Sequence, residues 1–122
     1  MSARHGGGGG SIVLVGSAAS RLGGYGEYVD YAASKGAVDT LGIGLAREVA
    51  REDVRVNVVR PGIVDTEIHA SGGRPDRVAE LAPGYPMGRA GTADEVAAAI
   101  VWLLSDEASY CTGAFLDVAG GR

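Results

Sequence analysis

The stretch "SIVLVGS", residues 11–17, indicates the class of fold. It is a short continuous apolar run, rich in β-branched residues, with glycine-rich segments on both sides. Such a run is typical of a strand covered on both faces, as in a parallel sheet. We therefore expect the first strand here. Residues 1–10 before it predict a flexible lead-in, because the run Gly6–Gly10 cannot bury apolar surface.

Helical and extended patterns alternate after this strand. Apolar residues recur at spacings of three and four over 29–51, which predicts a helix; they are Ala33, Ala37, Val38, Leu41, Leu45 and Val49. Residues 54–62 read as a second strand closed by Pro61-Gly62, and 113–121 contain a last short strand. Between them, 92–105 predict a helix with a capping box of Thr92 and Glu95. This order implies parallel strands joined by right-handed crossovers, hence an α/β layered fold.

Two segments lack a regular pattern. Residues 19–28 read as a glycine-rich loop, and 65–91 as a long irregular segment with room for a short helix around 75–81. A long irregular segment inside a compact domain is typical of a lid or binding loop. Within the first predicted helix, Gly36, Gly42 and Gly44 predict close packing against another element, because glycine otherwise weakens a helix interior.

Composition excludes several classes of protein. The chain has 122 residues, which suits one domain, and a formal net charge of −4. Its basic residues are scattered, which argues against a nucleic-acid groove or an anionic-membrane patch. A single cysteine, Cys111, excludes an internal disulfide. No apolar run reaches the roughly 18 residues of a membrane span, and no secretory signal is visible. These features predict a cytoplasmic protein.

Tyr31 and Lys35 carry the clearest chemical pattern. Residues four apart share a helix face, and none of the other four tyrosines has a lysine at that spacing. A nearby ammonium favours the phenolate form, so the phenol can exchange a proton with a substrate oxygen. Ser17 ends the first strand, where side chains of a parallel sheet face the ligand crevice. Alone, the Tyr31–Lys35 pair is more simply a solvated helix face, and Ser17 is more simply a turn residue. Their combination and their order along the chain favour a functional site.

Five blocks of sequence in this order resemble the short-chain dehydrogenase/reductase family. They are "IVLVGSAAS", "YAASKGAVDTL", "RVNVVRPGIVDT", "PMGRAGTADEVAAAIVWLLSDEASYCTG" and "FLDVAGG", and they cover essentially residues 11–121. The resemblance implies a doubly wound parallel-sheet (Rossmann-like) fold. Residues 11–122 would form its C-terminal half, three strands with flanking helices, on the catalytic and nicotinamide side and without the N-terminal dinucleotide-binding half. Strand 12–16 would then lack one neighbour and expose an apolar edge.

The resemblance also implies residue roles. Tyr31 would transfer the proton, Lys35 would hold the nicotinamide ribose hydroxyls, and Ser17 would orient the substrate. Ser17 lies one residue further from Tyr31 than in many members, and Ser20 is the alternative. The expected cofactor is NAD or NADP, not distinguished by this chain. Its implied contacts are Tyr31, Lys35, Pro61, Gly62, Ile63 and Thr66.

The implied function is an oxidoreductase that interconverts a small-molecule alcohol and a carbonyl, homo-oligomeric at full length and inactive as this chain alone. The alternative is a non-catalytic truncated remnant, or an interaction module that assembles with a full-length relative. No metal site is expected. His69 reads as a solvated loop residue, and Cys111 is expected to pack near the last helix. The stripe 100–104 with Trp102 reads as core or subunit interface.

Overall fold

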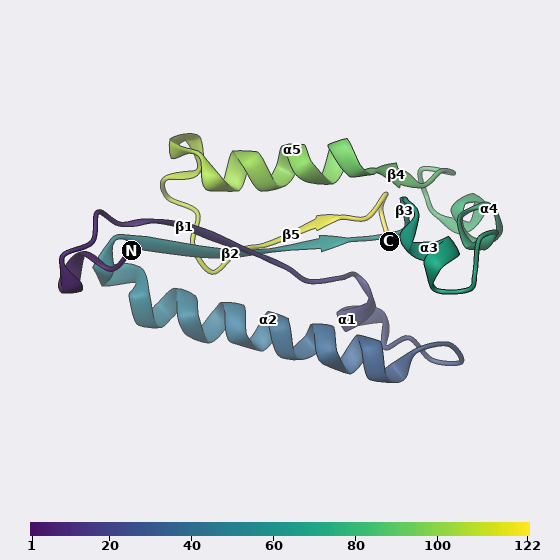
Figure 1. Ribbon diagram of the computed structural model, residues 1–122, viewed down its shortest axis with the longest axis horizontal. Coiled ribbons are helices and arrows are strands. Elements are labelled where there is room, and N and C mark those ends of the chain that lie inside the picture. The colour runs from purple at the N-terminus through teal and green to yellow at the C-terminus, as the bar shows by residue number, and fades with distance from the viewer.

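A computed structural model describes all residues, 1–122. Its centre is a parallel sheet in the order β1-β2-β5. The strands are β1 (Gly10–Val15), β2 (Val54–Pro61) and β5 (Phe115–Val118). Figure 1 shows α2 (Val29–Val49) along one face of the sheet and α5 (Ala93–Leu104) along the other. The predicted α/β fold, with three strands and flanking helices, is confirmed.

The central strand β2 is buried on both faces, and its side chains alternate between the two helices. Val56 packs with Ala46 of α2, and Val58 lies against Gly42 of the same helix. Val59 instead packs with Leu103 of α5. The sheet thus carries one apolar cluster on each face, which explains why β2 reads as a nearly continuous apolar run.

Helix α2 has the predicted extent, but its buried face is not the one that the apolar residues suggest. Its buried residues are Ala32, Asp39, Gly42 and Ala46. The expectation that all three helix glycines pack closely is confirmed only for Gly42, where an added Cβ would lie 2.4 Å from Val58 Cγ2. It is wrong for Gly36 and Gly44, where an added Cβ would meet nothing within 4 Å.

Helix α5 is fixed at both ends by polar contacts. At its start, Thr92 Oγ1 accepts from the Glu95 N–H at 3.2 Å, and Glu95 Oε2 accepts from the Thr92 N–H at 2.8 Å. This confirms the predicted capping box. At its other end, Arg55 of β2 donates to the carbonyls of Leu103 and Ser105, each at 2.9 Å. A cation here also complements the negative end of the helix dipole.

Short elements occupy the segments that the sequence left irregular. A helical turn, α1 (Ala19–Leu22), begins the expected loop 19–28. The segment 65–91 contains α3 (Ile68–Ser71), α4 (Arg77–Leu81) and a 3-10 turn at Ala82–Gly84. A small parallel pair, β3 (Val64–Asp65) with β4 (Gly91–Thr92), closes this segment at its base. In Figure 1 the elements of segment 65–91 gather beyond the arrowhead of β2, whereas α1 lies next to α2.

Three further 3-10 turns complete the secondary structure. They lie at Ala3–His5, Ala50–Glu52 and Asp106–Ala108. Before β1, the Gly9 N–H donates to the Met1 carbonyl at 2.8 Å, so residues 1–9 close into a turn. None of the helices combines the length and the apolar character that crossing a membrane requires.

The contrast between Gly42 and Gly36 gives a stability test on one helix. Gly42→Ala should destabilise the fold by about 1–3 kcal/mol, because the added methyl overlaps Val58 and forces α2 off the sheet. Gly36→Ala should stabilise it by about 0.5–1 kcal/mol, because alanine favours a helix and here meets open space. Urea unfolding of both variants measures this. Equal effects of the two substitutions would contradict the close contact.

Acid should selectively weaken the start of α5. The Arg89 guanidinium and the Thr92 N–H lower the pKa of Glu95 from 4.5 to about 2. Because the pKa is lower in the fold, the ionised carboxylate stabilises the protein above pH 4.5, and this contribution is lost as the pH falls towards 2. Glu95→Gln should therefore lower the melting temperature at pH 6 and have a shrinking effect towards pH 3. A difference that stays constant with pH would exclude this role.

Candidate functional site

The predicted site residues meet at the carboxyl ends of the parallel strands. Ser17 follows β1, Pro61 ends β2, and α2 runs back along the sheet from this end. In Figure 1 the start of α2 lies at the same end as β3, α3 and α4. Parallel strands place their carboxyl ends at one edge, which is where α/β proteins bind ligands.

Tyr31 and Lys35 lie side by side on the first turns of α2. The Lys35 Nζ is 5.7 Å from the centroid of the Tyr31 ring, and it donates a hydrogen bond to the Val15 carbonyl at 2.9 Å. The Tyr31 residue is 44% exposed, so its phenol is open to a ligand. The hydrogen bond to Val15, the last residue of β1, therefore brings Lys35 and Tyr31 close to the end of this strand. Ser17 follows two residues later in the chain.

The two candidate serines are oriented differently. Ser17 Oγ accepts from the Ala19 N–H at 3.1 Å, which leaves its own O–H free to donate to a ligand. Ser20 Oγ instead donates to the Ser17 carbonyl at 2.8 Å, so its proton is already used. Ser17 makes no hydrogen bond to Tyr31 or Lys35. Its position and free donor favour it over Ser20 as the ligand-facing hydroxyl.

The segment after β2 is tightly built. An added Cβ on Gly62 would lie 2.9 Å from Ala119 Cα and 3.0 Å from the Tyr85 ring, so only glycine fits. The Ile63 N–H donates to the Tyr85 hydroxyl at 3.1 Å, and the Ile63 carbonyl accepts from the Gly91 N–H at 3.0 Å. Both backbone groups of Ile63, one of the predicted cofactor contacts, are therefore already paired inside the protein.

The next peptide group is oriented differently. Because the Ile63 carbonyl points to β4, the Val64 N–H on the same trans peptide points away from it. The Val64 carbonyl accepts from His69 Nε2 at 2.9 Å. His69 is thus half-buried and bonded, which corrects its reading as a solvated residue. Thr66, a further predicted cofactor contact, is exposed at the start of the loop.

A contact that joins α4 to the start of α2, the Arg77 latch, was not predicted. Arg77 of α4 donates from Nη2 to Glu27 Oε2 and to the Tyr28 hydroxyl, each at 2.6 Å. The Tyr28 ring in turn meets the Tyr31 ring edge-on, with centroids 5.6 Å apart. The hydrogen bond from Arg77 lowers the pKa of Glu27, whereas burial raises the pKa of Tyr28. The partners lie about fifty residues apart, so no local pattern could reveal this contact.

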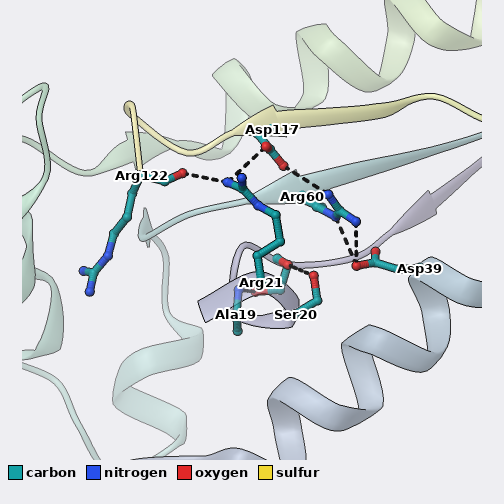
Figure 2. Close-up of polar contacts among 8 residues, drawn as sticks. Ala19, Ser20, Arg21, Asp39, Arg60, Asp117 and Arg122 are labelled. Atoms are coloured by element: carbon teal, nitrogen blue, oxygen red, sulfur yellow. Dashed lines mark hydrogen bonds and ion pairs between the residues drawn. The ribbon is translucent and has the colours of Figure 1, made fainter. Parts of the chain in front are cut away.

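An ion-pair network lies behind the site (Figure 2). Arg60 donates from Nε and Nη2 to Asp39 Oδ2 at 3.1 and 2.8 Å, and both side chains are largely buried. Asp117 lies 3.9 Å from Arg60 and 3.0 Å from Arg21, whose Nη2 also donates to the Arg122 carbonyl. The network thereby connects α1, α2, β2, β5 and the last residue, all next to segments that carry site residues.

The remaining candidates are structural. Cys111 packs against the cluster of Val59 and Leu103 on the α5 face, as predicted. Leu103 is 1% exposed and belongs to the core, whereas Val101 and Trp102 are exposed on the outer side of α5. No three His, Cys, Asp or Glu side chains of residues 1–122 are grouped so that they could hold a metal ion.

These features define the class of protein. Parallel strands with helices on both faces, and polar side chains gathered at their carboxyl ends, form part of a Rossmann-type α/β domain. Comparison with known proteins agrees: residues 2–122 match a family model described as "Enoyl-(Acyl carrier protein) reductase". The chain belongs to the short-chain dehydrogenase/reductase family.

Three similar proteins illustrate the match. Over all 122 residues the chain is 63% identical to the Escherichia coli protein described as "Uncharacterized oxidoreductase YgfF", covering 49% of it. Over 92% of its length it is 42% identical to the Salmonella typhimurium 3-oxoacyl-[acyl-carrier-protein] reductase FabG, covering 45%. A blue fluorescent protein from a metagenomic library, solved with NADPH, superposes with a TM-score of 0.81 at 32% identity, over 91% of this chain and 44% of that one. The chain thus spans about half the length of these relatives.

The network behind the site can be tested by removing one buried charge. Arg60→Met should destabilise the fold by about 3–5 kcal/mol, because it leaves Asp39 buried without its partner. Arg21→Met, which removes a half-exposed cation from the same network, should cost less than about 1 kcal/mol. Urea unfolding at pH 7 measures both. Similar losses in the two variants would show that the Arg60–Asp39 pair has no special role.

Proposed function

We propose that this protein acts as an NAD(P)-dependent oxidoreductase that interconverts an alcohol and a carbonyl, with Tyr31 as proton donor or acceptor. The observation that carries the proposal is the position of Lys35 Nζ, 5.7 Å from the Tyr31 ring and bonded at the end of β1. It supports a phenol and an ammonium that act together beside Ser17, at the edge where parallel sheets bind ligands.

Each of the three residues has a distinct task in this proposal. The free O–H of Ser17 donates to the substrate carbonyl oxygen and holds it towards Tyr31. Tyr31 then gives a proton to that oxygen during reduction, or takes one during oxidation. Lys35 places a positive charge beside the Tyr31 ring, and its remaining N–H groups bind ribose hydroxyls.

The residues after β2 fit the nicotinamide end of a cofactor. The Val64 N–H points away from β4 and is available to an amide oxygen, while Gly62 and Tyr85 hold this backbone rigidly in place. Thr66 adds an exposed hydroxyl beside it. When bound, the nicotinamide ring supplies or accepts the hydride. The paired backbone of Ile63 makes Val64 the better candidate for the amide contact.

The wider setting of the activity is also a proposal. Turnover should require the half that the relatives have and this chain does not span, so the chain alone should be inactive. The longer protein should be a cytoplasmic homo-oligomer, for which the exposed Val101 and Trp102 on α5 offer an apolar surface. Because similar proteins are named 3-oxoacyl-[acyl-carrier-protein] reductases, a 3-oxoacyl thioester is the first substrate to test.

The proposal predicts that one hydroxyl controls turnover. The chain is joined behind the N-terminal half of the Escherichia coli relative, and NADPH or NADH oxidation is followed with a 3-oxoacyl thioester. Tyr31→Phe should lower kcat by about 10²–10⁴-fold, because it removes the proton donor and keeps the ring. The matched control is Tyr28→Phe, which keeps the edge-on contact with Tyr31 and loses only the hydroxyl near Arg77. It should change kcat by less than about tenfold.

Near-normal turnover by the Tyr31→Phe protein would overturn the assignment. Calorimetry with NAD and with NADP on the chain alone tests the second part of the proposal. Sub-millimolar binding by the unjoined chain would show that the second half is not needed for the cofactor.

A further inference from the structure

Segment 66–84, which contains α3 and α4, is tied to the rest of the protein by few polar contacts. At its base, His69 bonds to the Val64 carbonyl at 2.9 Å. Of all residues in the segment, only Arg77 makes hydrogen bonds to residues 1–62. The position of α4 against the start of α2 therefore depends on the Arg77 latch.

Tyr28, which receives the latch, has a main chain that is fixed by its neighbours. Its N–H donates to the Gly24 carbonyl at 2.9 Å, and its carbonyl accepts from the Ala32 N–H at 3.0 Å in the first turn of α2. Gly24 has a φ of +61°, and an added Cβ there would lie 3.0 Å from Tyr28 Cδ2. The main freedom left to Tyr28 is therefore the orientation of its ring.

The Arg77 guanidinium sets that orientation from its place on α4. Its Cζ lies 4.8 Å from the centroid of the Tyr28 ring, and its Nη2 donates to the Tyr28 hydroxyl at 2.6 Å. Glu27 accepts from the same Nη2 at 2.6 Å, and this charge-assisted bond holds the arginine itself in place. The Arg77 side chain is only 12% exposed, so water screens these contacts weakly. One residue of the segment thus fixes a ring on α2.

The Tyr28 ring in turn borders Tyr31. The two rings meet edge-on, with centroids 5.6 Å apart and an angle of 86° between their planes. Edge-to-face contacts of this kind favour one relative orientation of the rings. Tyr31 is itself 44% exposed, so the contact with Tyr28 is a large part of what directs its phenol. A change in the orientation of Tyr28 is therefore passed on to Tyr31.

We propose that Arg77 and Tyr28 are positioning residues for Tyr31. While Arg77 holds α4 against α2, the Tyr28 ring fixes the direction of the Tyr31 phenol, and when the latch opens that direction is lost. Closure of segment 66–84 and alignment of the phenol are thereby coupled through one ring. The coupling of these side chains does not depend on what the protein catalyses, whereas its effect on turnover rests on the proposed function.

Nuclear magnetic resonance of the chain labelled with ¹³C-tyrosine tests the coupling without any substrate. The Tyr31 ring signal is identified by its loss in the Tyr31→Phe protein. Arg77→Met should shift this signal, because the Tyr28 ring leaves its edge-on orientation. The signal of Tyr110, which is fully exposed in the turn before β5, should stay in place and serves as the internal reference. An unmoved Tyr31 signal in the Arg77→Met protein would overturn the inference.

Two further variants separate the latch from general loosening of the segment. Arg74→Met removes an arginine that bonds to Glu80 within the same segment, and it should leave the Tyr31 signal unchanged. In a Tyr28→Ala background, Arg77→Met should cause no further shift, because the route from Arg77 to Tyr31 is already broken. An equal shift in the Arg74→Met protein, or a further shift in the double variant, would contradict the route through Tyr28.

Kinetics of the joined protein described above test the consequence for turnover. Arg77→Met should lower kcat about 10–100-fold, because a misdirected phenol is less often in reactive geometry. The KM for a short 3-oxoacyl thioester should change less than about threefold. Arg77→Lys, which keeps the charge and can still bond to Glu27, should recover part of the lost kcat. A raised KM with an unchanged kcat would show that Arg77 only closes the segment and does not position Tyr31.

The two proposals fail in different ways. If the Tyr31 signal follows Arg77 while the Tyr31→Phe protein turns over normally, the proposed function is wrong and the coupling stands. If Tyr31→Phe abolishes turnover while Arg77→Met changes neither the Tyr31 signal nor kcat, the reverse holds.

Discussion

The burial of β2 on both faces restricts how every element packed around this strand can be placed. The strand pairs with β1 and with β5, and each of its faces contacts a helix. Such a strand tolerates a polar side chain only if that side chain is fully bonded. Asn57 meets this condition although it is 0% exposed: its amide donates to the Cys111 carbonyl and accepts from the Ala114 N–H. The Asn57 side chain therefore fixes the position of residues 111–114, the turn that leads into β5.

The same strand sets the position of α2, and through it the site. Gly42 lets the helix approach Val58 closely, and the Arg60–Asp39 pair fixes the helix along its axis. Asp39 lies on the same helix face as Lys35 and Tyr31, at successive spacings of four residues. An ion pair and a close contact on this face therefore determine where the phenol and the ammonium lie relative to the end of β1.

Local patterns predicted the parts of the fold that depend on local physics. The apolar run at 11–17, the helix 29–51 and the capping box at Thr92 depend on neighbours within a few residues, and the structure bears them out. The buried face of α2 was not predictable, because Asp39 is buried only through Arg60, twenty-one residues away. The Arg77 latch and the bond of His69 to Val64 likewise depend on how the loop folds back. The spacing of Tyr31 and Lys35 predicted their proximity but not the edge carbonyl that Lys35 binds.

Two cations lie beside the aromatic rings of Tyr28 and Tyr31, and they differ in how their charge is compensated. The Arg77 guanidinium lies over the Tyr28 ring. It donates a hydrogen bond to the Glu27 carboxylate at 2.6 Å, which neutralises its positive charge. Lys35 is bonded to a carbonyl, which carries no charge and leaves the ammonium uncompensated. Of the two cations, only Lys35 therefore lies beside these rings without a carboxylate partner. The hydrogen bond to the Val15 carbonyl at the end of β1 therefore sets the position of the Lys35 ammonium, 5.7 Å from the centroid of the Tyr31 ring.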